Sequence, residues 1–401
     1  MYTLEPMANK KKIMFGAGIM LFTIFIFTGG FFVGKYSVVC NVCKPETVNF
    51  SLFWNAYEKL HENFIGKDTI TDQKIIYGAI NGMTKSLGDP YTAFFNPTEA
   101  KQFQQDLSGS FEGIGVEISI KKDQLTVVAP LKGTPGEKAG LKPGDIIVKI
   151  DDKSTADMSV EEAVTLIRGK RGTDVKLGIF REDWAVVRDI TITRGTIKVE
   201  SISWELKEGN VAYINIHQFD QQLSGDFKKV ALEILQSPAK NIVLDLRNNP
   251  GGYLETCQEI AGWFLKAGQV VTIEDFGQGK QQQLFNAEGN GAFAEYPMVV
   301  LMNKGSASAS EILAGALRDN RDIQLVGEKS FGKGSVQEMI TLQDGASLLK
   351  VTIAKWLTPK GSSISEVGLD PDVKLEITDA DIAAEKDPQL QKALEIIQGL
   401  R

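Results

Sequence analysis

The spacing of apolar positions changes along the chain, and each change predicts a different element. Residues 13–34 are 22 consecutive uncharged residues, six of them Phe. As a helix this run spans about 33 Å, enough to cross the hydrocarbon core of a bilayer. Lys10–Lys12 precede it and only Lys35 follows closely, so the positive-inside rule places residues 1–12 in the cytoplasm. We predict a single-pass anchor in the cell membrane, with the body of the chain outside the cytoplasm.

A cleaved signal peptide is the alternative for this segment. Its apolar core would normally be shorter, and no small-residue cleavage site of the A-x-A type follows here. The length of the run therefore favours an uncleaved anchor.

The next stretch is helical in its pattern. Residues 35–48 have no clear periodicity and predict a linker. Within 49–107, apolar residues recur near a 3.6-residue period until the turn residues of 87–90 interrupt them. We predict a small helical domain over 49–107.

Short β-branched runs dominate residues 111–195, which predicts a β-rich domain. One helix interrupts them, because Ser159 and Glu162 have the spacing of a capping box ahead of an apolar face. From 198 to 380, strands and helices alternate, which predicts an α/β core. Two of its strands, 241–246 and 298–302, are continuous apolar runs that lead into tight turns and helices.

A last helix is predicted in 381–401, with Asp387 as its N-cap and Pro388 at its first position. Its apolar stripe is formed by Leu390, Leu394 and Ile397. The stripe packs on the core or, together with the 49–107 helices, forms a homodimer contact, and the pattern leaves both alternatives open.

Charge and composition exclude several functions. The net charge of the 401 residues is −7, but residues 1–35 hold four Lys and one Glu, so the remainder carries −10. This negative net charge of residues 36–401 gives no sign of the basic surface that binds nucleic acid. The two His, His61 and His217, do not form an HExxH zinc motif, and we interpret both as structural. The single CxxC at 40–43 has no second CxxC to complete a zinc site, and Cys257 lies in an apolar pattern typical of core. We expect no metal and no cofactor.

Candidate chemistry lies in two segments of the α/β core. SASAS (306–310) follows a buried strand and precedes a helix, where a serine acts as an N-cap or as a nucleophile beside unpaired N–H groups. In GEKSFGKGS (327–335), Lys333 stands between two glycines. A buried lysine whose pKa fell from about 10.4 toward 7 could act as the base for a serine.

Residues 111–195 resemble a PDZ domain. FEGIGV (111–116) is similar to the carboxylate-binding loop of that family, and AGLKPGDII (139–147) to its most recognisable stretch. The resemblance implies that a peptide C-terminus binds at Gly113, Ile114, Gly115 and Val116 and adds as a strand beside 114–120.

The chain from about 48 to 400 resembles the carboxyl-terminal processing peptidases, also called tail-specific proteases. The resemblance is carried by SASAS and GEKSFGKGSVQ (327–337), together with LGDPYT (87–92), DLRNNPGG (245–252) and GLDPDV (368–373). It implies Ser308 as nucleophile, Lys333 as general base and Gln337, one helical turn later, as the residue that orients the lysine. The 25-residue separation of Ser308 and Lys333 agrees with the family and fits neither Ser306 nor Ser310.

The same resemblance implies an oxyanion hole from the backbone N–H groups of Ala309 and of Gly251 or Gly252. It also implies a crotonase/ClpP-like core. The predicted protein is a multidomain α/β serine endopeptidase that recognises accessible protein or peptide C-termini and cleaves through an acyl-enzyme. Arg168, at the end of the PDZ helix, is a candidate gating residue. The alternative function is a catalytically silent PDZ scaffold.

Overall fold

The structure, a computed structural model, describes residues 7–37, 48–121, 123–181, 183–277 and 279–399. It divides into two compact units, Met1–Ile76 and Tyr77–Arg401. The CxxC at 40–43 lies outside the described residues.

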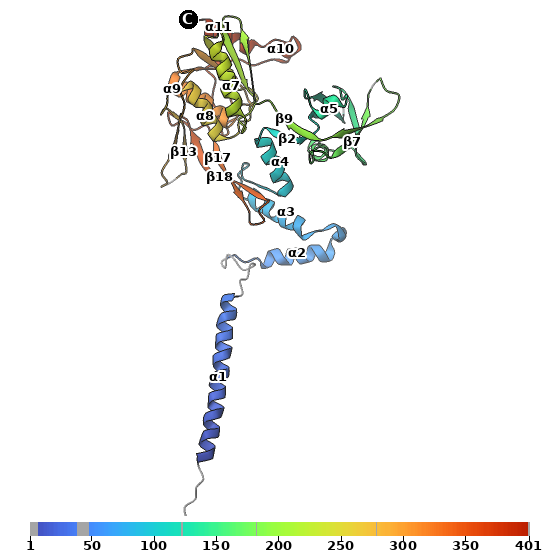
Figure 1. The fold of residues 1–401 in the computed structure, drawn as a ribbon, viewed down its shortest axis with the longest axis vertical. Helices are drawn as coiled ribbons and strands as arrows, with labels where there is room; N and C mark the ends of the chain where they lie inside the picture. The colour runs from blue at the N-terminus through green and yellow to red at the C-terminus, as the bar shows by residue number, and fades with distance from the viewer. Residues whose placement is uncertain (1–6, 38–47, 122, 182, 278, 400–401) are drawn as a thin grey trace, which may run out of the picture. The chain divides into compact units, whose positions relative to one another are not determined.

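The first unit holds α1 (Met7–Ser37), α2 (Ser51–Asn63), the 3₁₀ turn η1 (Lys67–Thr69) and the start of α3 (Asp72–Lys85). α1 is one uninterrupted helix (Figure 1), and its stretch Met14–Phe31 is long and apolar enough to cross a membrane. None of that stretch is buried in the single chain. A signal sequence near the N-terminus passes the same test of length and composition, so α1 fits either of the two alternatives predicted for it.

The second unit begins with the rest of α3 and then holds a strand that the apolar pattern did not predict. After the Asp89 turn, β1 (Ala93–Phe95) pairs antiparallel with β18 (Leu348–Leu357), and α4 (Pro97–Leu107) follows. The helical interpretation of 49–107 is therefore wrong for β1. Three residues are too few to display a strand period, and the pairing depends on a partner far along the chain.

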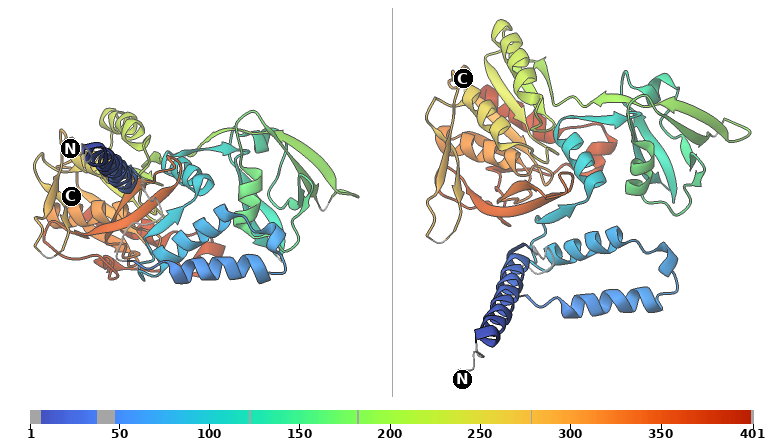
Figure 2. Two further views of the ribbon diagram at one scale, coloured as in Figure 1. Left: turned by 90° about the horizontal axis from the view of Figure 1, so that it is seen from below. Right: turned by 60° about the horizontal axis from the view of Figure 1, so that its bottom comes forward.

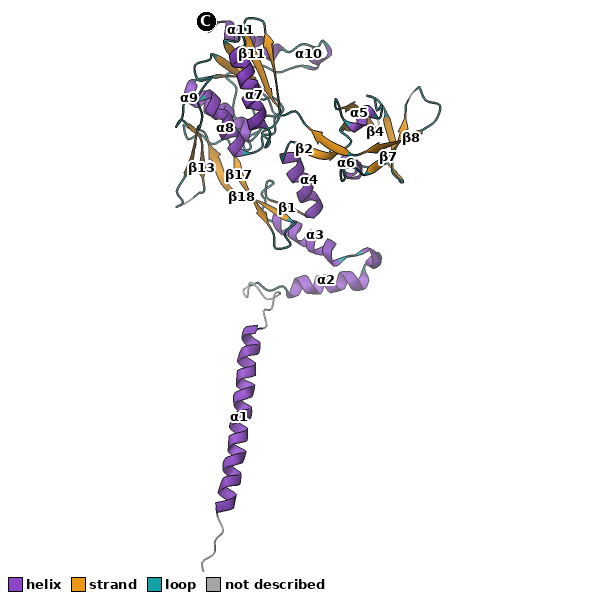
Figure 3. Cartoon of the chain, in the orientation of Figure 1, coloured by secondary structure: helices purple, strands orange, loops and turns teal. Residues whose placement is uncertain are grey.

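The PDZ segment is a strand-rich body (Figure 3). Its antiparallel sheet has the order β3-β4-β5-β7-β8, with β6 paired to β5, so β3 is an edge strand. The predicted capping box is confirmed, since Ser159 Oγ accepts from the Glu162 N–H and the Glu162 carboxylate accepts from the Ser159 N–H. The elements are β3 (Val116–Lys121), β4 (Gln124–Pro130), α5 (Pro135–Lys138), β5 (Ile146–Ile150), β6 (Lys153–Ser154), α6 (Val160–Ile167), β7 (Asp174–Phe180) and β8 (Arg188–Thr193).

A two-stranded ribbon joins this segment to the rest of the unit. β2 (Ser110–Gly113) enters the PDZ segment and β9 (Gly195–Lys198) leaves it, and the two strands pair antiparallel. They run side by side as the cyan and light-green connections in Figure 2.

The α/β core is built on a six-stranded sheet of order β10-β11-β12-β15-β16-β19. Its first pair is antiparallel and the other pairs are parallel. The strands are β10 (Ile202–Lys207), β11 (Val211–Ile216), β12 (Asn241–Asp245), β15 (Met298–Met302), β16 (Gln324–Gly327) and β19 (Val373–Lys374), and the helices are α7 (Leu223–Gln236), α8 (Leu254–Phe264), α9 (Ala309–Arg321), α10 (Asp379–Ala383) and α11 (Pro388–Gly399).

Both faces of this sheet are covered, which explains the continuous apolar runs of β12 and β15. Ile242 and Val300 point into a cluster with α7, α8 and α9, whereas their neighbours Val243 and Val299 pack with α11. Every residue of the two strands is consequently buried. The apolar stripe of α11 therefore packs on the core, one of the two alternatives predicted for it.

A second sheet of order β1-β18-β13-β14, with β17 paired to β18, lies in the same unit. Its remaining strands are β13 (Val270–Asp275), β14 (Gln283–Asn286) and β17 (Ser335–Thr341).

Candidate active site

The three serines that follow β15 have different environments. Ser306 Oγ donates to Leu246 O (2.8 Å) and Ser310 Oγ donates to Asn249 O (3.0 Å), and both residues are buried. Ser308 between them is only partly buried. Ser306 and Ser310 therefore fix the turn, and Ser308 is the serine that remains accessible to a substrate.

The backbone of Ser308 is strained. It precedes α9 with φ 57° and ψ −118°, a conformation that a side-chain-bearing residue rarely adopts. Such a residue costs about 1–3 kcal/mol and persists only where its surroundings hold it. Strain of this kind concentrates at functional sites, and here it falls on the predicted nucleophile.

Glu311, in the first turn of α9, connects the serine turn to the lysine loop. Its carboxylate is 1% exposed. Oε2 accepts from the backbone N–H groups of Ser308 and Lys333, each at 2.9 Å. Oε1 accepts from Ser330 Oγ (2.6 Å) and from the Gly332 N–H (2.7 Å). One buried carboxylate thus brings together two backbone positions that are 25 residues apart.

The sequence interpretation gave Glu311 no role. Its signal was the capping-box spacing from Ser308, because the N3 acid of a capping box accepts from the N-cap backbone N–H. That pattern predicts the contact within α9, and it contains no information about Ser330 or Lys333.

The glycines beside Lys333 are required by close packing of the neighbouring loop. A Cβ at Gly334 would lie 2.2 Å from Ser365 N, and one at Gly332, where φ is +92°, would lie 3.0 Å from Gly368 N. The GLDPDV segment therefore packs directly on the lysine loop, with Ser330 Oγ accepting from the Leu369 N–H at 2.6 Å.

Burial lowers the pKa of the Lys333 ammonium below its ordinary value of 10.5, and the positive charge of Lys350 adds to this effect. The Glu311 carboxylate opposes both by raising it. The ammonium nitrogen lies 5.8 Å from the centre of the Tyr91 ring, which comes from the LGDPYT motif. The expectation that Lys333 is a desolvated lysine agrees with this environment.

Gln337 lies on β17, so its predicted place one helical turn after Lys333 is wrong. The chain after Gly334 pairs with β18 instead of forming a helix. The side-chain amide donates to Ser335 Oγ (2.7 Å) and Thr352 Oγ1 (3.5 Å). Its role in orienting Lys333 stays a prediction.

Gly251 lies against the serine turn. A Cβ there would be 2.7 Å from Ser308 Cβ and 2.9 Å from Ala309 N. The Gly251 N–H donates to Asn249 Oδ1 (2.9 Å). Gly252 instead meets Phe219, whose carbonyl oxygen would be 2.1 Å from a Cβ at that position. Both glycines have positive φ, so neither position suits a larger residue.

The DLRNNPGG turn is supported by Arg247, whose side chain is 11% exposed. It donates to both carboxylate oxygens of Asp245 and, through its two terminal nitrogens, to Asp387 at 2.9 and 2.8 Å. Burial alone would raise the pKa of Asp387, but the hydrogen bonds from Arg247 and the α11 N-terminus lower it overall. Asp387 therefore links the C-terminal helix to the DLRNNPGG turn.

The other chemically reactive side chains do not belong to this site. His61 is on α2, and His217 Nε2 is 3.4 Å from Ser203 Oγ. Cys257 is fully buried, and burial raises the pKa of its thiol. Among the described residues, no group of His, Cys, Asp and Glu could hold a metal ion.

The predicted peptide-binding segment lies where β2 leads into β3. A small pocket of about 80 Å³ there is lined by Ile114, Gly115 and Val116 on one side and by Val164, Ile167 and Arg168 on the other. The Arg168 guanidinium stacks over the Phe111 ring at 4.4 Å. The pocket therefore lies between an edge strand and the end of α6.

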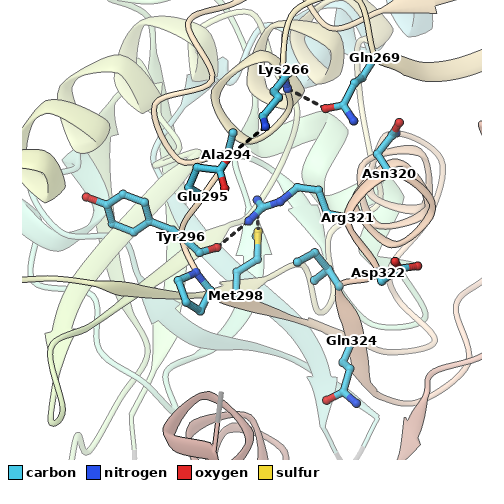
Figure 4. A pocket seen from close by; sticks show the side chains of 12 residues that line it. Lys266, Gln269, Ala294, Glu295, Tyr296, Met298, Asn320, Arg321, Asp322 and Gln324 are labelled. Carbon is cyan, nitrogen blue, oxygen red and sulfur yellow. Dashed lines mark hydrogen bonds and ion pairs between the residues drawn. The ribbon is translucent and has the colours of Figure 1, made fainter. Parts of the chain in front are cut away.

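A larger pocket of about 500 Å³ lies elsewhere (Figure 4). Its lining includes Tyr296 just before β15 and Met298 at its start, together with Arg321 before β16 and Gln324 at its start. The guanidinium of Arg321 donates to Tyr296 O at 2.6 Å. These residues are at the amino-terminal edge of the parallel strands, whereas Ser308 follows their carboxyl ends, so this pocket is separate from the candidate site.

Comparisons with known proteins agree with this geometry. The model of peptidase family S41 matches residues 210–375, and a PDZ domain model matches residues 126–181. The chain is 38% identical over 357 residues to the carboxy-terminal processing protease CtpA of Bacillus subtilis, a match that covers 89% of this chain and 74% of that protein. It is 36% identical over 375 residues to a probable CtpA-like serine protease of Staphylococcus haemolyticus, covering 92% and 74%.

Among solved structures, a photosystem II D1 C-terminal processing protease is similar at 29% identity and a TM-score of 0.51, over 84% of this chain and 91% of that one. A putative S41 protease from Bacteroides fragilis has a TM-score of 0.55 at 16% identity, covers 80% and 90%, and supports the fold alone.

The fold and these matches define a serine peptidase with a PDZ domain. The chain belongs to the carboxy-terminal processing proteases of peptidase family S41. The predicted family and enzyme class are thereby confirmed. The membrane anchor, the crotonase/ClpP-like core, the domain boundaries and the roles of individual site residues stay predictions.

Proposed function

We propose that this protein is a membrane-anchored endopeptidase that binds protein C-termini through its PDZ domain and cleaves peptide bonds with Ser308 and Lys333. One observation carries the catalytic part. Glu311 Oε2 accepts from the backbone N–H groups of both residues at 2.9 Å, which joins a strained, accessible serine to a lysine whose pKa is lowered by burial.

In the proposed mechanism, the neutral Lys333 amine takes the Ser308 hydroxyl proton as Oγ attacks the scissile carbonyl carbon. The lysine ammonium then donates that proton to the leaving amine, and the acyl-enzyme remains on Ser308. Lys333 next takes a proton from water as that water attacks the ester carbonyl carbon, and the lysine ammonium returns the proton to Ser308 Oγ as the second product leaves. Gln337 is the residue proposed to orient the lysine amine.

The tetrahedral oxyanion would be held by the Ala309 N–H and by that of Gly251 or Gly252. Gly251 is the glycine in contact with the serine turn. Its N–H donates to Asn249 Oδ1, so it would exchange that acceptor for the oxyanion when substrate binds.

Substrate capture is assigned to the PDZ domain. β3 is an edge strand with backbone groups available for strand addition, and the adjoining apolar pocket offers space for a terminal side chain. α1 would keep the enzyme at the membrane by its residues 14–31. The substrates implied are proteins or peptides with accessible C-termini.

The test is cleavage of casein, and of a peptide with a free apolar C-terminus, by the full chain in detergent. Ser308→Ala and Lys333→Arg should each abolish turnover while tail binding persists. Lys329→Ala, an exposed lysine of the same loop, is the matched control and should retain activity. Turnover that survives Ser308→Ala would overturn the assignment, and tail binding without any turnover by the parent would favour the silent scaffold.

Arg168 is proposed to gate activity through Phe111, because its side chain stacks on that ring at the start of the PDZ ribbon. Arg168→Ala should alter basal or tail-stimulated cleavage, and Arg171→Ala is its control. Unchanged basal and stimulated rates in Arg168→Ala would remove it from the mechanism.

A homodimer through the N-terminal helices is the proposed oligomeric state. No residue of α2 is buried in the single chain, and its Leu52, Trp54 and Leu60 side chains are exposed by 78, 44 and 50%. Sedimentation of the detergent-solubilised chain should give a dimer that Leu52→Glu dissociates, and a monomeric parent would refute this proposal.

A further inference from the structure

Asp220 occupies the point where the PDZ ribbon meets the peptidase core. Its carboxylate is 1% exposed. Oδ1 accepts from the backbone N–H groups of Gln222 (2.8 Å) and Leu223 (2.9 Å) at the start of α7. Oδ2 accepts from the hydroxyl of Ser201, three residues after β9.

The segment that enters the ribbon reaches the same carboxylate. A Cβ at Gly109, where φ is +68°, would lie 2.0 Å from Asp220 Oδ2, so the backbone before β2 lies directly on the carboxylate. Gln222 Nε2 donates to Ser108 O at 3.0 Å. Both connections of the PDZ domain are therefore fixed to the loop that carries Asp220.

Phe219, the residue before Asp220, holds the turn that contains Gly251 and Gly252. The Phe219 N–H donates to Gly251 O (2.9 Å), and Phe219 O accepts from the Tyr253 N–H (2.8 Å). These two bonds enclose Gly252 in a short parallel bridge. Asp220, which anchors the PDZ ribbon, is thus adjacent in sequence to Phe219, whose bridge to Gly252 holds the turn of the proposed oxyanion hole. Gly251 of that turn contacts Ser308.

We propose that Asp220 is a positioning residue that couples the PDZ ribbon to the oxyanion turn. A displacement of the ribbon acts on Asp220 through Ser201 and Gly109, and the Phe219 bridge carries it to Gly251 and Gly252. This inference rests on the proposed function, because it assigns the turn to oxyanion stabilisation. Asp220 itself does not touch the substrate.

The decisive variant is Ser201→Ala, which removes one hydroxyl and leaves the Asp220 contacts to α7 in place. Ser203→Ala, two residues along on β10, is its matched control. Casein hydrolysis by the full chain is measured with and without a synthetic decapeptide that ends in three apolar residues and a free carboxylate. The C-terminal amide of that peptide is the ligand control.

A displacement of catalytic groups by about 1 Å costs on the order of a hundredfold in rate, and we expect Ser201→Ala to lower kcat by about tenfold because only one of the anchors is lost. KM for casein and the Kd of the decapeptide, measured by fluorescence anisotropy, should stay at the parent values. Stimulation by the decapeptide should shrink, whereas Ser203→Ala should behave as the parent does.

Thermal unfolding identifies variants that are only destabilised. If Ser201→Ala does not fold, Gln222→Ala provides a second test of the coupling. This variant releases Ser108 O without changing the buried Asp220 carboxylate. A parent-like kcat and parent-like stimulation in the folded variant would overturn the coupling. If Ser308→Ala abolishes turnover in the same series, the proposed function survives that result, whereas activity in Ser308→Ala would refute the function itself.

Discussion

Replacing Glu311 by Gln tests whether one buried carboxylate both holds the site together and tunes its base. The two oxygens accept four hydrogen bonds, two on each. A glutamine keeps one carbonyl oxygen and presents its NH₂ group to the donors on the other side. Two donors that now bond to a charged oxygen would therefore lose their acceptor.

The expected loss of stability follows from those two hydrogen bonds. A buried donor left without an acceptor costs about 1–3 kcal/mol, so we expect Glu311→Gln to lower the free energy of unfolding by about 2–6 kcal/mol. If the Oε2 side is lost, the backbone of Ser308 and that of Lys333 are released from each other. The plateau kcat should then fall by about a hundredfold, which corresponds to an ångström-scale misplacement of reacting groups.

The pH profile of kcat/KM distinguishes an effect of Glu311 on Lys333 from simple destabilisation of the fold. Glu311 raises the pKa of Lys333 through its negative charge. Removal of that charge lowers the lysine pKa further, so the rise of kcat/KM with pH should move to lower pH in the variant. In the proposed mechanism only the neutral amine accepts the serine proton, which fixes the sign of this shift.

The assay is casein hydrolysis across a pH series, with urea unfolding of the same samples. Glu338→Gln, an exposed residue on β17, is the matched control and should leave stability and profile unchanged. A Glu311→Gln enzyme with parent-like plateau kcat and an unmoved pH profile would show that the carboxylate neither positions the serine nor acts on the lysine.

Three further outcomes follow from the same site. In the parent, kcat/KM should rise with pH and level off below the ordinary lysine pKa of 10.5, because burial lowers the pKa of Lys333; a profile that is still rising at pH 10.5 would contradict this environment. Asp387→Asn should lower stability by about 1–3 kcal/mol at neutral pH. Since the folded-state pKa of Asp387 is lowered, its stabilisation is present above the unfolded pKa and lost as pH falls through the folded one, so the difference between variant and parent in urea unfolding should vanish in strong acid. Gly251→Ala should abolish casein cleavage without loss of decapeptide binding, because the added methyl group meets Ser308 Cβ at 2.7 Å; full activity in this variant would exclude the close approach.

Local pattern was sufficient for much of the fold. β15 begins and ends where the apolar run of 298–302 predicted, and the Ser159 capping box forms as expected. The apolar stripe of the last helix contacts the core sheet through Ile397. In each case, the information is contained in a short window whose periodicity reports which face is buried.

The candidate site was predicted only in part, because its decisive contacts are long-range. The three serines of 306–310 differ in the structure by their partners, Leu246 O for Ser306 and Asn249 O for Ser310. No local spacing specifies those partners. The same holds for Glu311, whose bond to the Lys333 N–H crosses from α9 to a separate loop.

Gln337 differs from these residues, because its predicted helical placement came from the family resemblance. The family resemblance implies a place one helical turn after Lys333, but pairing with β18 places Gln337 on a strand with a register shift beside it. Tertiary pairing overrides local pattern at such positions.

The Arg247–Asp387 ion pair has a consequence for how the enzyme matures. During synthesis, Ser308 and Lys333 leave the ribosome before Asp387, so a nascent chain contains its proposed nucleophile and base while Arg247 still lacks one of its two carboxylate partners. The DLRNNPGG turn acquires its full support only after α11 has emerged and docked on the sheet. The proposed oxyanion turn thus depends on a helix that is synthesised after the proposed nucleophile and base.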